Sequence, residues 1–388
     1  MQLNKWTIAL AAVGAVSFAA QAEEHASNPI SSAITGTTLS GYVDTAAIWN
    51  FGSGNQQVNR GINTGANRQD GFNLNAVKVA LEKPLDEGTW SAGYKVETIL
   101  GPDAAALPGL VANNVALKQA YVAVRAPIGN GIDFKVGQYD PIVGYEVFDS
   151  YANPNFSRSF GYNLEPLGHT GILASYQFNE VFGASAGIAN GGGLGGNALV
   201  AGNTPGGAES VKNYMFGVVA KAPESTGWLA GSSLYAGIID GSNRFGKDAA
   251  LIYVGGTIAT PWKELTVGAS YDTILNANAA AFQAANWNQN YVGGHYANAF
   301  AVYVSYQITE KLKLNNRFEY ANSDVGAFNV GNPTHEKVFG VTTTADYALW
   351  ANVVTRLEFR WDHAANAGGI GGGQRNDLSV VANLIYKF

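Results

Sequence analysis

The sequence predicts an all-β protein: a transmembrane, antiparallel, up-and-down β-barrel of about 16 strands, although 14 or 18 strands also fit the pattern. Three observations support this prediction. Segments in which every second residue is apolar recur along the chain, and this is the period of a β-strand. The connections between these segments alternate between short and long. Only 13% of the 388 residues are charged, against about 25% in an ordinary soluble domain.

The N-terminus predicts an export signal. Lys5 precedes an apolar stretch from Trp6 to Phe18, and Ala20-Gln21-Ala22 supplies the small residues of a cleavage site. A buried or anchoring helix is less favoured, because the stretch is too short to span a bilayer comfortably. We therefore expect a signal peptide at 1–22, a short periplasmic N-terminal segment at 23–36 and an outer-membrane β-barrel at 37–388.

Sixteen strands are expected from residue 37 onward, bounded by stretches rich in Gly, Pro and Asn. Their ranges are 37–51, 71–83, 89–100, 115–126, 131–139, 169–178, 182–190, 211–222, 227–239, 249–260, 264–274, 297–308, 311–321, 336–348, 352–363 and 376–388. Segment 227–239 alternates poorly, so its register is poorly defined. All twelve prolines lie outside these ranges, as expected for a residue that cannot donate to a sheet ladder.

The connections indicate how the barrel is oriented. Seven are short, whereas the other eight run from nine residues at 240–248 to twenty-nine at 140–168. Membrane barrels show this asymmetry, with short periplasmic turns and long extracellular loops. Tryptophans gather near both ends of the strands, as in two aromatic belts; they are Trp90, Trp228, Trp262 and Trp350 at short turns, and Trp49 and Trp361 at the other end.

The strand pattern also predicts which face of the barrel is wet. In "VVTRLEFRWDH" (353–363), Leu357 and Phe359 share one face, while charged residues occupy the other. A barrel of this size leaves an aqueous interior, so the apolar face should contact outer-membrane lipid. The predicted pore wall, taken from three strands, consists of Lys95, Glu97, Lys313, Arg317, Glu319, Arg356, Glu358, Arg360 and Asp362.

The last strand carries a second signal. Tyr386 and Phe388 lie on one face of an alternating strand that ends the chain. This ending resembles the assembly signal of bacterial outer-membrane barrels, which implies insertion by the barrel-assembly machinery. The alternative is an ordinary edge strand that happens to end in Phe.

Residues 134–171 allow a narrower identification. They contain Gly144-Tyr145-Glu146, Ser157-Arg158-Ser159 and Pro166-Leu167-Gly168-His169-Thr170-Gly171 after a strand. This stretch resembles the Putative beta-barrel porin-2, OmpL-like family, and residues 72–85 look like the second strand of that family. Elsewhere the chain agrees only in its barrel pattern. The resemblance implies a bacterial outer-membrane porin.

The predicted function is passive diffusion of small hydrophilic solutes and ions through a water-filled channel. The alternative is a barrel that only anchors an adhesin or an enzyme. An enzyme is not expected, because Gly183-Ala184-Ser185-Ala186-Gly187 matches G-x-S-x-G within a strand and not at a strand-to-helix turn. His295, His335 and His363 lack a short ligand spacing, so neither a metal nor a cofactor is expected. The sequence pI of about 5.4 and the lack of a basic stripe argue against nucleic acid.

The connection 140–168 is predicted to fold into the barrel and form its constriction, because it carries too much apolar surface to remain in water. Asp140, Glu146, Asp149 and Glu165 outnumber the single Arg158, so an acidic edge is expected to face the basic wall across the lumen and to sort solutes by charge. In the competing interpretation these charges form local, solvated pairs. The preferred solute, the pore diameter, gating and the association of three barrels into a homotrimer remain open.

Overall fold

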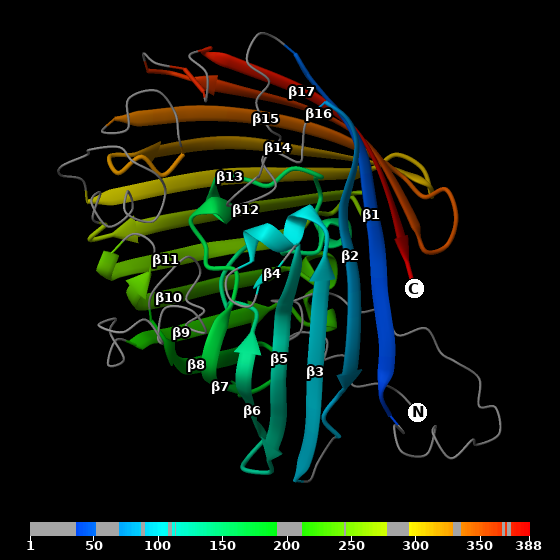
Figure 1. The fold of residues 1–388 in the computed structure, drawn as a ribbon. Helices are drawn as coiled ribbons and strands as arrows, with labels where there is room; N and C mark the ends of the chain where they lie inside the picture. The colour runs from blue at the N-terminus through cyan, green and yellow to red at the C-terminus, as the bar shows by residue number, and fades with distance from the viewer. Residues whose placement is uncertain are drawn as a thin grey trace.

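The computed structural model describes residues 36–51, 70–86, 90–107, 111–112, 114–191, 212–243, 246–277, 295–328, 335–366, 369–370 and 374–388. Within these ranges the chain forms one antiparallel barrel whose strands run as a meander (Figure 1). The predicted signal peptide and most of segment 23–36 lie outside the described residues. Across the part of the chain that is described, no helix is long and apolar enough to cross a bilayer.

Seventeen strands are distinguished in these ranges, and all but β4 form the ring, which leaves sixteen. They are β1 (Thr38–Phe51), β2 (Gly71–Lys83), β3 (Ser91–Leu100), β4 (Val111–Ala112), β5 (Val115–Ala126), β6 (Ile132–Tyr139), β7 (His169–Gln177), β8 (Phe182–Asn190), β9 (Lys212–Lys221), β10 (Ser233–Asn243), β11 (Gly246–Ala259), β12 (Leu265–Leu275), β13 (Tyr296–Gln307), β14 (Leu312–Ser323), β15 (Glu336–Tyr347), β16 (Val353–Ala364) and β17 (Asn376–Lys387).

The barrel closes because β1 pairs with β17 as well as with β2. Beyond the last strand residue, Phe388 exchanges two backbone hydrogen bonds with Gly41, at 2.8 and 3.0 Å. Closure gives each strand of the ring a partner on both sides, which a bilayer requires because it offers no water to backbone groups. Tyr386 and Phe388 lie exposed on the outside of this seam. Their role as an assembly signal stays a prediction.

Most predicted strands match the observed ones to within two residues at each end. The largest difference is at 227–239, where the strand begins only at Ser233. Residues Glu224–Leu229 form a 3-10 helix, η4, and Gly227 and Gly231 have positive φ angles of 66° and 84°. These glycines turn the chain where the prediction extended it, which explains why the segment alternated poorly.

The two faces of the strands separate as predicted. On β16, Leu357 and Phe359 are exposed on the outer surface, while Arg356, Glu358 and Arg360 point inward and are buried. Tryptophans at the short-turn end, including Trp90 and Trp350, are also exposed. The outer surface is therefore apolar, as contact with lipid requires, and the charged side chains are directed to the interior.

Candidate functional site

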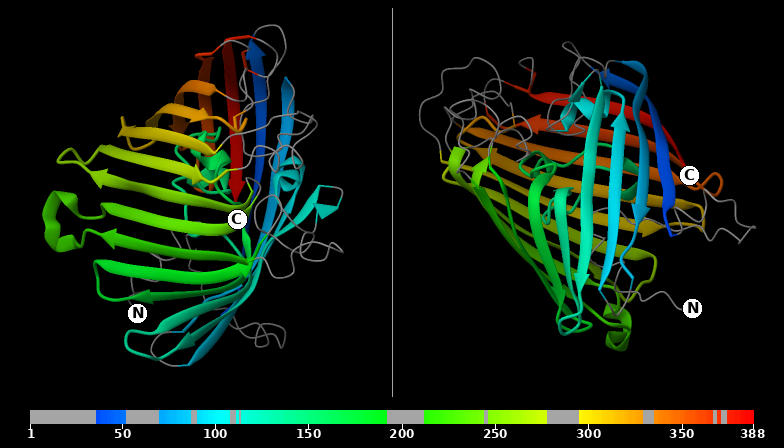
Figure 2. Two further views of the ribbon diagram at one scale, coloured as in Figure 1. Left: turned by 90° about the vertical axis from the view of Figure 1, so that its left-hand side faces the viewer. Right: turned by 60° about the horizontal axis from the view of Figure 1, so that its bottom comes forward.

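The segment 140–168 connects β6 to β7 and lies inside the barrel, as predicted (Figures 1 and 2). We call it the folded loop. It includes two short 3-10 helices, η2 (Ser150–Ala152) and η3 (Gly161–Asn163). Phe156, Tyr162 and Leu164 are buried against the wall. Burial of these side chains supports the inward position, but it leaves the polar backbone of the loop in need of partners.

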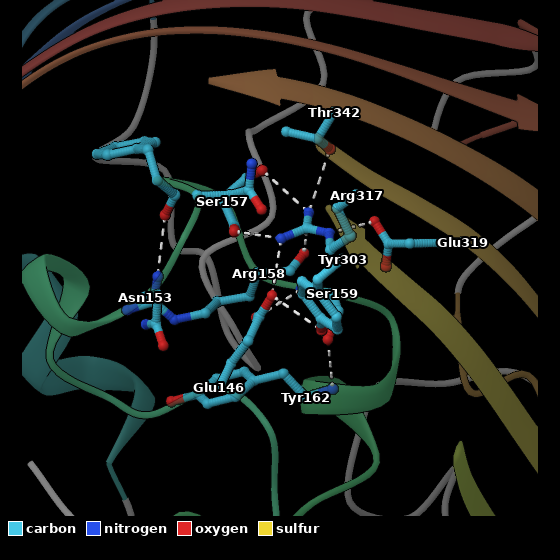
Figure 3. Close-up of polar contacts among 12 residues, drawn as sticks. Glu146, Asn153, Ser157, Arg158, Ser159, Tyr162, Tyr303, Arg317, Glu319 and Thr342 are labelled. Atoms are coloured by element: carbon cyan, nitrogen blue, oxygen red, sulfur yellow. Dashed lines mark hydrogen bonds and ion pairs between the residues drawn. The ribbon is translucent and has the colours of Figure 1, made fainter. Parts of the chain in front are cut away.

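Arg317 on β14 supplies several of those partners, as Figure 3 shows. Its side chain is 0% exposed. The guanidinium donates to Glu146 Oε1 of the loop at 2.8 Å, to Glu319 Oε2 at 2.7 Å and to the carbonyl oxygen of Ser157 at 2.8 Å. Hydrogen bonds between ionised groups are the strong ones, so Arg317 joins the loop to β14 at a point from which water is excluded.

Strand β16, which is separated from β14 by β15, binds the loop backbone with both donors and acceptors. Arg356 donates to the carbonyl oxygens of Ser150 and Asn153, both at 2.8 Å, and Arg360 donates to that of Arg158 at 2.6 Å. Glu358 accepts from two backbone N–H groups, of Phe156 at 2.6 Å and Ser157 at 3.0 Å. These charged side chains provide the hydrogen bonds that the loop backbone would otherwise have made to water.

A second ionic cluster holds the loop to β2, β3 and β5. Lys78 Nζ lies 2.5 Å from Asp149 Oδ2, and Lys118 Nζ lies 2.6 Å from Asp140 Oδ2. Both lysines also contact Glu97 Oε1, at 3.0 and 3.1 Å, and Lys95 Nζ approaches its other oxygen at 3.6 Å. Glu97 therefore binds three lysines, and two of them extend to carboxylates of the loop.

The wall formed by β9, β10 and β12 packs closely against the loop because their shapes are complementary. A Cβ atom added at Gly237 would lie 2.7 Å from Val143 Cγ1, and one at Gly217 would lie 3.2 Å from Ile142 Cδ1. At Gly268 an added Cβ would collide with the hydroxyl of Tyr145. We call these three glycines the glycine cradle. Their missing side chains let the first arm of the loop approach the inner wall closely.

A pair of buried carboxyl groups lies where the loop returns to the barrel wall. Glu165 of the loop and Asp272 of β12 are both buried and lie close enough for their charges to interact. Burial, together with the nearby carboxylates of Asp272 and Glu146, raises the pKa of Glu165 well above its usual range. The pair is therefore stable when Glu165 keeps its proton, since two carboxylates without that proton would repel each other.

Two details of the predicted site are wrong. Arg317, Glu319, Arg356, Glu358 and Arg360 point inward but are covered by the loop and do not line free water. The predicted acidic edge is absent as well. The acidic residues of the loop, Asp140, Glu146, Asp149 and Glu165, are directed to the wall and not across the lumen. The physical reason is that an unpaired buried charge is strongly destabilising, so each charge buried with the loop has to meet an opposite charge.

The competing interpretation was closer, although its local pairs are buried and not solvated. Arg158 remains within the loop, where it donates to the carbonyl oxygens of Phe156 and Phe148 at 2.9 and 2.7 Å. Of the other wall residues, Lys95 and Glu97 belong to the lysine cluster, whereas Lys313 and Asp362 are partly buried. Asp362 accepts from Arg360 at 2.7 Å.

Four residues that face the interior and contact the loop or its partners were not predicted from the sequence. They are Lys78, Lys118, Asp272 and Tyr303. Alternation gave a signal for Lys78, which follows Ala76 and precedes Ala80 on the inner face of β2. It gave one for Asp272 too, since that residue shares a face of β12 with Gly268 and Ser270.

The motifs considered for catalysis and metal binding lie apart from the loop. Ser185 is in the middle of β8, and its hydroxyl is 2.8 Å from that of Ser175 on β7. His295 and His335 are exposed just before β13 and β15, and His363 contacts Asn376 at 2.9 Å. Throughout the described ranges, no three His, Cys, Asp or Glu side chains are placed to hold a metal ion.

Comparison with known proteins agrees with this architecture. The family described as Putative beta-barrel porin-2, OmpL-like matches residues 36–388. A search of curated proteins finds no match.

Three solved structures illustrate the similarity in fold. The outer membrane channel DcaP of Acinetobacter baumannii has a TM-score of 0.60 and 13% identity, over 91% of this chain and 97% of that one. An anion-selective porin from Comamonas acidovorans has a TM-score of 0.60 and 13% identity, over 91% and 99% of the two chains. The trimer form of the outer membrane protein OmpT of Vibrio cholerae has a TM-score of 0.58 and 12% identity, over 91% and 99%.

Proposed function

The chain belongs to the Putative beta-barrel porin-2, OmpL-like family and is a porin of the bacterial outer membrane, and we propose that its folded loop sets the width and the selectivity of the channel. One observation carries this proposal. The loop crosses the interior of the barrel and is bonded to two separate parts of its wall, through Asp149 to Lys78 on β2 and through Glu146 to Arg317 on β14. A segment fixed on both sides narrows the lumen permanently.

Small hydrophilic solutes and ions are the cargo that such a narrowed barrel admits. The proposed selection is first by size, because the charges of the loop are paired with those of the wall. Paired, covered charges generate only a weak field at the surface that a solute meets. We therefore propose that the loop acts as a fixed obstruction. This takes the place of the predicted transverse field between an acidic loop and a basic wall.

Single-channel recording in planar bilayers tests this function. Stable ion conductance, reduced by neutral sugars up to a size limit, is the expected result. Bilayers that stay electrically silent while the protein is folded and inserted would instead support the alternative, in which the barrel only anchors an adhesin or an enzyme. The recording should include a salt gradient, because the proposal expects a weak preference between small cations and anions.

We further propose that residues 1–22 are removed on export, that 23–36 stay in the periplasm, and that the barrel-assembly machinery reads Tyr386 and Phe388. The exposed position of both aromatic residues at the closing seam supports that last point. N-terminal sequencing of the membrane-inserted protein should begin at Glu23. Deletion of Phe388 should leave the chain in the periplasm, and normal insertion of that variant would contradict the proposal.

We also propose that the protein works as a homotrimer and has no catalytic activity. The structure of OmpT from Vibrio cholerae in a trimer form supports the first statement, at the level of fold. The strand position of Ser185, paired with Ser175, supports the second. Light scattering of the detergent-solubilised protein should give the mass of three chains, and a mass of one chain would refute the trimer.

A further inference from the structure

A cavity of about 250 Å³ lies between the folded loop and the wall formed by β10 and β11. The loop contributes Tyr145 and Pro154 to its lining, and the wall contributes Tyr235, Tyr253 and Thr257. Thr257 lies in the last part of β11, which leads into a short turn, so the cavity is on the periplasmic side of the loop. Ala152, at the end of η2, also lines it and is exposed although the surrounding loop is buried.

The lining of this cavity is uncharged. It contains no carboxylate, amine or guanidinium group, in contrast to the surfaces where the loop meets β2, β5, β14 and β16. A charged solute that entered would lose water without gaining a partner of opposite charge, which costs free energy. A neutral solute pays no such penalty, so the cavity discriminates by charge through desolvation.

The shape and chemistry of the lining indicate the class of neutral solute. Tyr145 and Tyr235, which are partly exposed, present aromatic surface with a polar hydroxyl at its edge, whereas Tyr253 is buried in the lining. Ser233 and Thr257 add hydroxyl groups. Rings that bear C–H faces and peripheral hydroxyls match this combination, because the faces pack on aromatic surface while the hydroxyls exchange hydrogen bonds.

The lining is also held in place before any solute arrives. The ring of Tyr145 stacks on that of Tyr303, with centroids 3.9 Å apart and planes inclined by 14°. The Thr257 hydroxyl donates to the Tyr145 oxygen at 3.3 Å. Fixed side chains lower the entropy cost of binding. Sites for drug-sized ligands occupy about 300–1,000 Å³, so this cavity is suited to a smaller molecule.

We propose that this cavity is a binding subsite for a neutral, single-ring sugar or polyol on its path through the channel. The proposal rests on the proposed function, since it assumes that the barrel conducts. It assigns Tyr235 as an aromatic contact on the wall and Tyr145 as its counterpart on the loop. Charged analogues of the same size should pass without being retained there.

The test is current blocking by glucose in single-channel recordings of the intact protein, with gluconate and glucosamine as charged probes of similar size. Interruptions should increase with glucose concentration and saturate, whereas both charged probes should produce few. Tyr235→Ala should weaken the apparent affinity for glucose roughly three- to tenfold, and Tyr235→Phe should retain most of it. Tyr214→Ala, on the outer surface of β9, is the matched control and should behave as the parent protein.

Each outcome has one meaning. An inserted protein that never conducts defeats the proposed function itself. A conducting protein overturns the subsite alone if glucose blocking does not saturate, if the charged probes block equally, or if Tyr235→Ala leaves the affinity unchanged. Should Tyr235→Ala fail to fold, labelling of Ala152→Cys with a hydrophilic thiol reagent provides a second readout. Glucose should slow that labelling and gluconate should not; equal rates with both would also reject the subsite.

Discussion

The folded loop meets two walls of the same barrel by different chemistry. On β14 and β16 the contact consists of buried arginines and glutamates, such as Arg317 and Glu358, bonded to the charges and backbone of the loop. On β9, β10 and β12 it consists of the glycine cradle, where Ile142, Val143 and Tyr145 fit against missing side chains. One wall binds through hydrogen bonds and charge, and the other through shape.

This difference indicates that charged residues inside a channel can have a structural role. The charged walls are covered because their side chains bind the loop, and the surface that the loop leaves open is the neutral one around Tyr235 and Thr257. Removing a charge should therefore alter the position of the loop more than the preference for ions. Altering the cradle should move the same loop without any change in charge.

The largest effect is expected for Arg317→Ala. Glu146 and Glu319 would remain buried without the cation that they share, and breaking a buried pair in this way costs about 3–5 kcal/mol. The loop should leave the wall, so single-channel conductance should rise severalfold and the thermal stability of the barrel should fall. Arg125→Ala is the control, because Arg125 pairs with Asp133 at 2.6 Å in a partly exposed position beside the short turn from β5 to β6. Equal conductance of the two variants would show that Arg317 does not hold the loop.

A smaller effect is expected for Gly237→Val. Its new side chain would occupy the space of Val143, since an added Cβ alone lies 2.7 Å from Val143 Cγ1. Overpacking of this kind costs about 1–3 kcal/mol. The open-channel current should become noisier and change in mean value, with ion selectivity preserved. Ala236→Val adds the same kind of bulk on the opposite face of β10 and should leave the current as it is; if both variants behave alike, the cradle has no role.

The smallest effect is expected from pH at the Glu165 and Asp272 pair. The pKa of Glu165 is raised in the docked loop, so docking is favoured by the protonated form, is strongest in acid, and weakens as the pH rises through that raised pKa. Conductance should increase gradually as the pH rises from the ordinary pKa of a glutamate, about 4.3, through the raised pKa of Glu165. Glu165→Gln should flatten this dependence, while Glu180→Gln, at an exposed turn, should keep it. A pH response that survives Glu165→Gln would have another origin.

Much of the barrel could be predicted from the sequence, because the alternation of single residues reports directly which face meets lipid. Leu357 outside and Arg356 inside follow from a period of two. The predicted start of the strand at 227–239 was wrong, because Gly227 and Gly231 give no alternation and adopt backbone conformations that end a strand. The inward position of 140–168 also followed from its apolar content, which needed a surface to cover it.

The contacts that the site residues make could not be predicted from the sequence. Whether Glu146 faces the lumen or Arg317 depends on the path of a long irregular segment, and no periodic pattern encodes that path. The sequence suggested charges opposed across water, whereas burial of the loop requires those charges to meet. The cavity beside Tyr235 was missed for the same reason, since its two sides come from residues far apart in the chain, Tyr145 and Tyr253 among them.

The central claim is that the folded loop covers the charged wall and leaves Ala152 facing the open lumen. The chain contains no cysteine, so single-cysteine variants can be labelled without background. In reconstituted barrels, a hydrophilic thiol reagent should react quickly with Ala152→Cys and lower the conductance. It should react with Ser157→Cys, buried between the loop and β14, only after unfolding. Rapid labelling of Ser157→Cys in the folded barrel, at a rate close to that of Ala152→Cys, would contradict the account.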